Sequence, residues 1–578
     1  MLSDVSDNLL HGSIPKSICH LVDIELLYLD DNNLTGELDF EYMFLKLKNL
    51  TYLALSFNKL SVISKPNINV ILPKFKTLFL ASCNLYEFPY FLQNQDELIF
   101  LDLSKKKLHG QIPKSFWNVS KNTLLYLNLD ANFLTGFNQL PVVLQWSTLY
   151  DLSIANNILQ GSLPIPPPSI ISYNVSNNRL TGEVSPFFCN LTYISSLDLS
   201  NNSLGGILPQ CLGNIINSLS VLYLQNNNFH GNIPQASVKG CKLRTINLSQ
   251  NQLQGKIPGS LAGCDQFLNL GNNQIHDIFP SWLGTLVVLK VLILGSNEFC
   301  GEIEEPKSAF DFPMLRIIDL SNNSFTGKLP SQHFQIWNAM KTSDADSLRY
   351  WGADTSDTNL YNKPAYWSMV ITNKGTKIFY ERIQELFVAI DLSTNKFEGE
   401  IPMDIGNLKG LRLLNLSNNI LTGHISSSFE NLTQLKTLDL SQNKLSGEIP
   451  QQLSQLTFLE FLNVSHNRLT GSIPHGKQFD TYQNNSFKDN PGLCGDPLSK
   501  KCGILPPPPP SAAGGEDRSS SSLFEFGWKV VLMGYACGLV VGVLVGHIVI
   551  ERKPEWFMTT FGIKQQKMVR VKTRGPTN

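Results

Sequence analysis

The sequence is poor in charged residues and carries almost no net charge. Charged residues make up 16% of its 578 residues, whereas about 25% is usual in soluble domains. The 46 Lys and Arg residues nearly balance the 47 Asp and Glu residues, so the formal net charge is −1. This balance argues against a polybasic nucleic-acid-binding protein. The hydrophobic share of 42% excludes a chain that is disordered throughout.

Motifs of enzymes and of metal sites are also missing. No H-E-x-x-H, G-x-S-x-G, G-x-G-x-x-G or H-R-D sequence occurs, and the ten His residues are scattered. The ten Cys residues form no C-x-x-C pair, so zinc sites and thioredoxin-like redox sites have no support. We therefore predict a protein that is not an enzyme and that holds no cofactor and no metal ion.

What the sequence has in excess is Asn, combined with regularly spaced Leu. The pattern L-x-L-x-x-N-x-L-x-G-x-I-P recurs, for example with Leu438, Leu440 and Asn443. Its Asn position returns mostly every 21 to 26 residues, and only Cys83 and Lys106 replace Asn there. The Asn positions are 8, 32, 58, 83, 106, 132, 157, 178, 202, 227, 251, 273, 297, 323, 395, 419, 443 and 467.

Each repeat predicts one coil of a solenoid. In L-x-L both leucines point inward and the residue between them points outward, which is the alternation of a short strand. The Asn amide can bond backbone groups of neighbouring coils, and the Gly allows the bend that follows. One coil cannot bury its leucines alone, so stacked coils must build a continuous core and one long parallel sheet.

These motifs resemble the leucine-rich repeat of the plant extracellular subtype, which the G-x-I-P segment marks, over roughly residues 1–505. The resemblance implies a solenoid with a parallel β-sheet on its concave face and short 3-10 or loop segments on its convex face. We expect this order of segments: repeats at 1–330, an insertion at 331–386, four further repeats at 387–474, a cap with a Cys pair at 475–505, a linker at 506–529, a transmembrane helix at 530–550 and a short basic cytoplasmic tail at 551–578.

The insertion is rich in Tyr and Trp, which are favoured anchors in binding surfaces. The same rings could equally fill a small core of the insertion. They are Trp337, Tyr350, Trp351, Tyr361, Tyr366, Trp367 and Tyr380. An insertion followed by four repeats is similar to the arrangement of plant receptor-like proteins. In that family a Lys-x5-Tyr motif at this place is associated with contact to a co-receptor, and it maps onto Lys374 and Tyr380. Both residues could also simply lie on a surface strand.

Six Cys residues are candidates for disulfide bonds. Two pairs lie 22 and 23 residues apart, close to one coil, so each pair could bridge adjacent coils or remain two buried thiols. The C-terminal segment Asn490–Gly495 with Cys502 resembles the C-terminal cap of the family, which implies a small loop closed between Cys494 and Cys502. The two pairs are Cys189 with Cys211 and Cys241 with Cys264.

Twelve N-x-[ST] sequons, together with the Cys pairs, favour an exported glycoprotein. Several of them arise because the repeat itself reads N-L-S or N-N-S, so the occupancy of each one is open. They begin at Asn33, Asn49, Asn118, Asn174, Asn190, Asn201, Asn247, Asn322, Asn415, Asn431, Asn463 and Asn484.

A membrane anchor is predicted near the C-terminus. Val530–Ile550 contains no Asp, Glu, Lys or Arg and is long enough to cross a bilayer. Basic residues dominate the 28 residues after it, which places the C-terminus in the cytosol and the repeats outside the plasma membrane. A Gly at every fourth position forms one smooth stripe on this helix, which favours close packing of another membrane helix, although Gly can also be mere filler. The stripe consists of Gly534, Gly538, Gly542 and Gly546.

A large outer surface and a tail too short for a kinase predict a receptor that signals through partners. The resemblance to plant receptor-like proteins implies a pathogen-derived or peptide ligand, an adaptor receptor-like kinase bound through the membrane helix, and a co-receptor kinase with leucine-rich repeats. We expect a receptor in plant immunity. A developmental peptide receptor of the same architecture and a non-functional truncated receptor are the alternatives.

The outward residues of the strands are expected to select the ligand. Each strand of the first five full repeats is predicted to expose an aromatic residue, and Tyr223 is a later example. Rings spread over a concave sheet can bind a ligand, although stacking between strands could equally stabilise the sheet. The candidates are Tyr28, Tyr52, Phe79, Phe100, Tyr126 and Tyr223.

The first residues suggest a chain that lacks its beginning. Met1–Asp4 contains neither the basic nor the apolar region of a secretory signal, and the sequence from Val5 onward already lies within a repeat. The Cys-bearing N-terminal cap of the family does not precede it. We therefore expect a fragment of a longer gene product.

Overall fold

The computed structural model describes most of the first 503 residues, which form one unit, Met1–Gly503. The described ranges are 2–64, 72–105, 107–137, 143–215, 218–235, 242–261, 266–342, 349–353 and 365–503.

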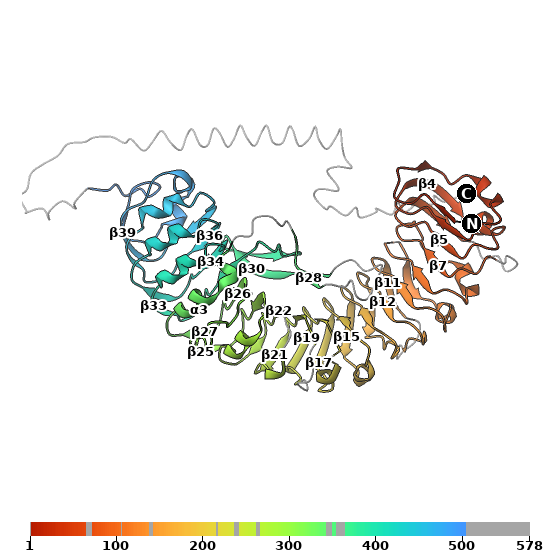
Figure 1. Cartoon of the computed structure of the whole chain (residues 1–578), viewed down its shortest axis with the longest axis horizontal. Coiled ribbons are helices and arrows are strands. Elements are labelled where there is room, and N and C mark those ends of the chain that lie inside the picture. Colours follow the sequence, from red (N-terminus) through yellow and green to blue (C-terminus); the bar gives the residue numbers. More distant parts are fainter. Residues whose placement is uncertain are drawn as a thin grey trace, which may run out of the picture. The chain divides into compact units, whose positions relative to one another are not determined.

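Eighteen short strands stack into one parallel sheet that lines the inner side of this unit (Figure 1). In every strand after β1 the middle residue is buried, as Leu197 is in β16 (Ser196–Asp198), while its neighbours face the concave surface. The predicted leucine-rich-repeat solenoid with a parallel sheet is therefore confirmed. The other strands of this sheet are β1 (Leu2–Asp4), β3 (Leu26–Tyr28), β5 (Tyr52–Ala54), β7 (Thr77–Phe79), β8 (Phe100–Asp102), β10 (Tyr126–Asn128), β12 (Asp151–Ser153), β14 (Ser172–Asn174), β18 (Val221–Tyr223), β20 (Thr245–Asn247), β22 (Phe267–Asn269), β24 (Val291–Ile293), β26 (Ile317–Asp319), β32 (Ala389–Asp391), β34 (Leu413–Asn415), β36 (Thr437–Asp439) and β38 (Phe461–Asn463).

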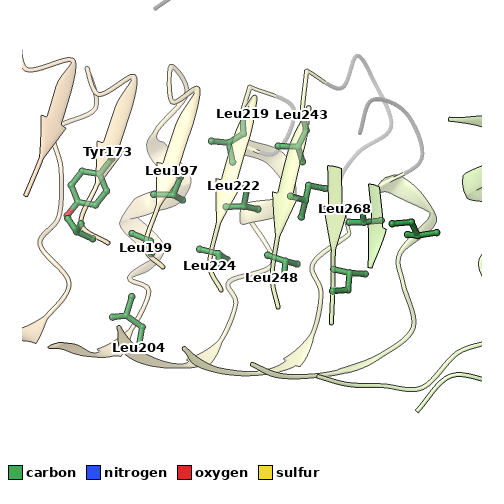
Figure 2. Packing of buried hydrophobic residues seen from close by; sticks show 14 of the residues in the cluster. Tyr173, Leu197, Leu199, Leu204, Leu219, Leu222, Leu224, Leu243, Leu248 and Leu268 are labelled. Carbon is green, nitrogen blue, oxygen red and sulfur yellow. The ribbon is translucent and has the colours of Figure 1, made fainter. Parts of the chain in front are cut away.

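Leucines of successive coils build the core behind this sheet. Leu197 pairs in register with Leu222 of the next strand, and the following leucine of each coil, such as Leu199, is buried in the same layer. Figure 2 shows these side chains stacked from coil to coil. The buried cluster extends along the whole unit, from Ile14 to Leu493. Each coil thus buries its apolar side chains against its neighbours, as expected for a solenoid.

In most coils a buried or half-buried Asn ties the coil to the preceding one. The side-chain amide of Asn443 donates to the carbonyl of Leu416 in the preceding coil at 3.0 Å, and to those of Leu440 and Ser441 in its own coil. Its oxygen accepts from the backbone N–H of Leu421 at 3.1 Å. One side chain therefore satisfies buried backbone groups of two coils, which explains why the sequence uses so much Asn.

Two exceptions in this row of Asn residues have different outcomes. The thiol of Cys83 donates to the carbonyl of Leu55 at 3.3 Å, so Cys keeps one bond of the set. Lys106 lies outside the described residues. A further Asn joins the row, because Asn490 donates to the carbonyl of Val464 at 2.9 Å. Asn490, which the sequence places in the cap, thus also continues the row of Asn residues.

Short strands and helical turns complete each coil. Gly447 in β37 (Ser446–Glu448) has a φ of 77°, which glycine adopts at little cost and other residues rarely adopt. The remaining strands after the L-x-L segments are β2 (His11–Gly12), β4 (Asn33–Asp39), β6 (Lys59–Ile63), β9 (His109–Ile112), β11 (Phe133–Phe137), β13 (Gln160–Ser162), β15 (Arg179–Glu183), β17 (Ser203–Ile207), β19 (Asn228–Asn232), β21 (Gln252–Gly255), β23 (Gln274–Ile275), β25 (Cys300–Glu302), β27 (Ser324–Thr326), β33 (Glu398–Glu400), β35 (Ile420–Thr422), β39 (Arg468–Ser472) and β40 (Gly492–Cys494).

The helical turns are mostly single 3-10 turns, which fits the short convex segments expected from the resemblance. The α-helices are α1 (Phe40–Phe44), α2 (Leu212–Ile215) and α3 (Ser331–Ile336). The 3-10 helices are η1 (Lys16–His20), η2 (Tyr90–Asn94), η3 (Lys114–Asn118), η4 (Pro186–Asn190), η5 (Gly259–Leu261), η6 (Ser281–Thr285), η7 (Asn338–Met340), η8 (Met403–Asn407), η9 (Ser427–Asn431), η10 (Gln451–Gln455), η11 (Lys477–Thr481) and η12 (Asn484–Ser486).

The sheet continues without a break past the insertion. β26 pairs directly with β32, and Ile318 lies opposite Ile390. α3 packs on η8 of the next coil, and Phe334 and Trp337 are part of the solenoid core. The rest of the insertion contains two small antiparallel ribbons. These consist of β28 (Gly352–Ala353) with β29 (Ala365–Tyr366), and of β30 (Met369–Asn373) with β31 (Thr376–Tyr380).

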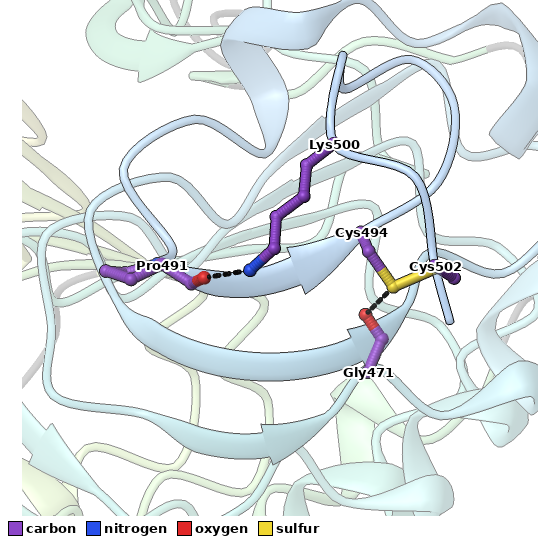
Figure 3. The surroundings of a disulfide bond; sticks show 5 residues. All are labelled: Gly471, Pro491, Cys494, Lys500 and Cys502. Atoms are coloured by element: carbon purple, nitrogen blue, oxygen red, sulfur yellow. Dashed lines mark hydrogen bonds between the residues drawn. A yellow bond between two sulfur atoms is a disulfide. The ribbon is translucent and has the colours of Figure 1, made fainter. Parts of the chain in front are cut away.

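Two disulfide bonds are present in the described residues. Cys189 is bonded to Cys211, with Cα atoms 5.5 Å apart on adjacent coils. Cys494 is bonded to Cys502 at the C-terminal end of the solenoid, where Lys500 donates to the carbonyl of Pro491 (Figure 3). The other candidate pair, Cys241 with Cys264, lies outside the described residues.

In the described part of the chain, no helix has both the length and the apolar character that crossing a membrane requires. The predicted linker, transmembrane helix with its four glycines, and cytoplasmic tail fall in 504–578, outside the described residues.

Candidate ligand-binding surface

The concave face presents the first and third residue of every strand, and the predicted aromatic residues occupy these positions. Their rings contact one another across strands. The ring centroids of Tyr28 and Tyr52 are 4.4 Å apart, and those of Tyr52 and Phe79 are 5.9 Å apart. The rings of Phe100 and Tyr126 follow at 6.3 Å. These contacts stabilise neighbouring strands, as the alternative interpretation of the aromatic residues stated.

The prediction that each of these strands exposes its ring is wrong for Tyr126, which is only 4% exposed. Neighbouring strands of a parallel sheet lie so close that one ring covers the next. Burial raises the pKa of Tyr126 and of Tyr223 above the ordinary value of a phenol. The remaining candidates are half-buried: Tyr28, Tyr52, Phe79, Phe100 and Tyr223.

Next to these rings the concave face contains a hollow of about 700 Å³. Carboxylates share its walls with the rings, among them Asp102, Asp130 and Asp198. Burial raises the pKa of Asp130 to about 6, although the hydroxyl of Ser153 donates to this carboxylate and opposes the rise. Rings beside carboxylates suit a peptide that carries apolar and hydrogen-bond-donating side chains.

The insertion lies across the concave face and is anchored there by Trp367. This residue is 1% exposed, and its ring centroid is 5.3 Å from that of Phe267 in β22. Its indole N–H donates to the hydroxyl of Thr245 in β20 at 3.1 Å. The ring centroid of Trp351 lies 5.7 Å from that of Trp367, and the ammonium group of Lys290 lies over the Trp351 ring. The two indoles are thus buried against the repeats. They are neither exposed binding anchors nor part of a core that belongs to the insertion alone, which were the two interpretations of the sequence.

The repeats provide an apolar strip for this contact, which sequence reasoning missed. Five consecutive strands carry an apolar first residue that faces the concave side and is nonetheless fully buried. The insertion covers the strip with Trp367, Met369 and Ile371. A run of outward apolar residues on a sheet signals a cover, because a bare patch of this kind is rare on soluble proteins. The strip consists of Phe267, Val291, Ile317, Ala389 and Leu413.

The tip of the β30–β31 hairpin reaches the last repeats. The ammonium of Lys374 contacts Glu460 at 2.6 Å, and Lys436 contacts the other oxygen of the same carboxylate at 3.1 Å. Hydrogen bonds from both lysines hold the pKa of Glu460 below its usual value. The hydroxyl of Thr437 donates to the side-chain oxygen of Asn373 at 2.7 Å. The hairpin therefore bridges from β22 to the strands β36 and β38.

The two co-receptor candidates both take part in this arrangement. The hydroxyl of Tyr380 accepts a hydrogen bond from Asn373 at 2.7 Å, and its ring lies 5.2 Å from that of Phe387. Tyr380 therefore stabilises the hairpin through its contacts with Asn373 and Phe387. The side chain of Lys374 remains 45% exposed beside Glu460. The structure brings the two residues to one hairpin and gives each a contact inside the chain.

A second hollow, of about 350 Å³, lies between this hairpin and the strands beneath it. We name it the hairpin pocket. The hairpin lines it with Ser368–Thr372, Lys377 and Phe379. The repeats line it with polar side chains and one apolar one, including Asn247, Asn269, Asn272, Ile293, Ser296 and Asp319.

A pair of carboxylates occupies adjacent strands at this pocket. Asp319 of β26 lies opposite Asp391 of β32. Burial raises the pKa of Asp391 to about 8, and repulsion by Asp319 adds to the rise. Burial also raises the pKa of Asp319, and the nearby ammonium of Lys377 opposes part of this rise. One oxygen of Asp391 is buried without a hydrogen-bond partner among the described residues.

The structure divides the twelve sequons by exposure. Asn247 and Asn415 are buried, and the oxygen of each side chain accepts a hydrogen bond from a neighbouring Ser hydroxyl. Asn174, Asn201 and Asn463 are half-buried. The exposed ones are Asn33, Asn49, Asn118, Asn190, Asn322, Asn431 and Asn484.

The chain is similar in sequence to receptor-like proteins of Arabidopsis thaliana. Receptor-like protein 35 is 41% identical over 558 residues, which cover 95% of this chain and 55% of that protein. Receptor-like protein 54 is 39% identical over 566 residues, which cover 97% of this chain and 70% of that protein. The chain spans just over half the length of the first of these relatives.

Family models and solved structures agree with the fold. Models described as leucine-rich repeat match residues 266–325 and 409–469, and also 193–215 and 242–264. The structure of the plant peptide hormone receptor RGFR1 in complex with RGF2 superposes with a TM-score of 0.63 at 22% identity. It covers 85% of this chain and 78% of that receptor. At this level of identity the similarity shows a shared fold.

Proposed function

The chain belongs to the plant leucine-rich-repeat receptor-like proteins, which are binding proteins and not enzymes, and from this premise we propose that it is a cell-surface receptor for an extracellular ligand. The ligand is a pathogen-derived molecule or a peptide, bound on the concave face of the solenoid. The observation that carries the proposal is this face itself, where a hollow lined by rings and carboxylates leads to a hairpin fixed across the sheet.

Partner kinases supply the signal in this proposal. The predicted glycine stripe at 530–550 binds the membrane helix of an adaptor receptor-like kinase, and the insertion with the last four repeats meets a co-receptor kinase. Lys374 supports the second contact, because its side chain stays 45% exposed at the hairpin tip beside Glu460. The receptor lies in the plasma membrane with its repeats outside the cell, and it acts in immunity.

Expression of the full chain in leaf cells that lack it tests the proposal. We expect one or more fractions from microbial culture filtrates to cause a burst of reactive oxygen only in cells that contain the chain. A response confined to the plant's own peptides would instead support the developmental alternative. The absence of any chain-dependent response, with no receptor kinase co-purified, would contradict the receptor proposal.

Export also predicts which sequons carry glycans. We expect glycans at the exposed Asn49, Asn190 and Asn431, and none at Asn247 and Asn415 in the folded protein, because a glycan on a buried side chain cannot fit. Peptide mass spectrometry after enzymatic deglycosylation in heavy-oxygen water distinguishes the two groups. A glycan found on Asn247 in the secreted, folded protein would contradict the burial argument.

The adaptor contact predicts a loss of association when the glycine stripe is filled. Replacing Gly538 and Gly542 by Leu is expected to abolish co-precipitation of the adaptor kinase, because Leu keeps the two helices apart. Replacing Ala536 and Val540 by Leu changes two side chains with the same spacing on the opposite face of the helix, and this variant is expected to keep the adaptor. Unchanged co-precipitation by the glycine variant would remove the stripe from the account.

A further inference from the structure

One edge of the hairpin has backbone groups that nothing in the described chain uses. The pair next to the two-residue loop is Asn373 with Thr376. In such hairpins this pair is hydrogen-bonded, and hydrogen-bonded pairs then alternate with non-hydrogen-bonded pairs along the strands. Val370 and Thr372 belong to non-hydrogen-bonded pairs, so their N–H and C=O groups point away from β31. Within the described residues no other backbone segment bonds to these two residues. Among the residues that the structure describes, this edge of β30 therefore has no partner strand.

This free edge faces the hairpin pocket. The pocket is lined by five consecutive residues, Ser368–Thr372, but only by alternate residues of β31, Lys377 and Phe379. A consecutive run indicates that the pocket lies along the edge of β30. Lys377 and Phe379 lie opposite Thr372 and Val370 in the register, on one face of β31. Their side chains extend from this face toward the pocket.

On the opposite wall, glycine replaces the usual side chain of the repeat. Most coils have a Ser two residues after the end of the strand, as Ser321 follows Asp319, and its backbone N–H donates to that residue. The coil of β24 has Gly295 at this place. A Cβ atom on Gly295 would lie 2.6 Å from a carboxylate oxygen of Asp319. The carboxylate of Asp319 therefore lies where a side chain of residue 295 would begin, and Gly295 leaves room for it at the wall of the pocket.

We propose that the hairpin pocket binds an extended peptide segment, which adds as a strand to the free edge of β30 and presents a basic side chain to Asp319. The inference rests on the proposed receptor function and names the class of ligand for one part of its surface. An extended peptide matches the free N–H and C=O groups of Val370 and Thr372. The amides of Asn269 and Asn272 can donate to and accept from its other edge. The carboxylate of Asp319, which lines the pocket, favours a cationic side chain.

A random heptapeptide library displayed on phage tests the proposal when it is selected on the full chain in nanodiscs. Val370→Pro removes one outward N–H and leaves the hydrogen bonds of the hairpin intact, whereas Val370→Ala removes only the side chain. We expect Val370→Pro to bind the selected peptides about tenfold more weakly than Val370→Ala, because one hydrogen bond to the peptide is lost.

The other edge of the hairpin provides a matched control. Phe379→Pro removes an outward N–H from β31, and it is expected to bind the peptides as Phe379→Ala does. Asp319→Asn is expected to remove the enrichment of Arg and Lys among selected peptides. Hydrogen exchange at the hairpin verifies that each variant is folded.

Two results would overturn the proposal. Either no peptide is selected, or Val370→Pro binds the selected peptides as well as Val370→Ala does. The cell response described above does not depend on these peptides. If that response persists while the pocket fails its test, only the assignment of the pocket is lost and the receptor function stands.

Discussion

Replacing Asn443 by Ala is expected to lower the free energy of local opening around its coil by about 3 kcal/mol, because buried backbone groups lose their partners. The affected groups include the carbonyl of Leu416 and the N–H of Leu421, which belong to the preceding coil. The loss should therefore spread to both coils. Hydrogen exchange measured by mass spectrometry over 416–445 in the full chain gives this free energy directly.

The residue before it provides the control for this substitution. Gln442 is exposed, and its backbone N–H keeps its bond to the carbonyl of Ser465 whatever the side chain. Gln442→Ala is expected to change the same free energy by less than about 0.5 kcal/mol. Equal exchange rates for the two variants would show that the Asn side chains do not hold the coils together.

Replacing Trp367 by Ala is expected to release the insertion from the concave face. The substitution leaves a large cavity against Phe267 and removes the hydrogen bond to Thr245, at a cost of about 4 kcal/mol. The hairpin at 369–380 should then exchange its amide hydrogens rapidly, while β20 and β22 keep their protection. Limited proteolysis should cut first within the insertion.

Phe379→Ala is the matched control, because Phe379 lies on the same hairpin and is 64% exposed. This variant is expected to retain the exchange pattern and the protease resistance of the wild type. If Trp367→Ala also retains them, contacts other than the indole hold the insertion in place.

Repeat spacing was sufficient to predict the solenoid, and the reason is physical. The L-x-L alternation has one solution that buries both leucines, and a buried Asn can be satisfied only by the coils on either side of it. Leu197 and Asn443 illustrate the two rules. The spacing of about one coil also pointed to Cys189 and Cys211 as a pair, while the resemblance to the family's cap implied the bond between Cys494 and Cys502.

Contacts between distant segments could not be read from the sequence in the same way. The ion pair between Lys374 and Glu460 joins residues 86 positions apart, and no periodic pattern links them. The burial of Tyr126 depends on rings from other strands. The docking of Trp367 left a signal, the run of outward apolar residues that includes Phe267 and Val291, which becomes interpretable once the faces of the strands are known.

The central claim is that ligands bind the concave face near the hairpin, and a glycan placed there tests it most directly. Gln274→Thr creates a sequon at Asn272, which lines the hairpin pocket. Lys409→Thr creates one at Asn407, at the end of η8, in the same phase as the exposed Asn431. Both substituted side chains are exposed, and mass spectrometry verifies that each new sequon carries its glycan.

The measurement is the chain-dependent reactive-oxygen response of leaf cells that express either glycosylated variant. The account predicts that the glycan at Asn272 abolishes the response, because it fills the space in front of the pocket, and that the glycan at Asn407 leaves the response unchanged. A response of full size with the glycan in place at Asn272 would contradict the account.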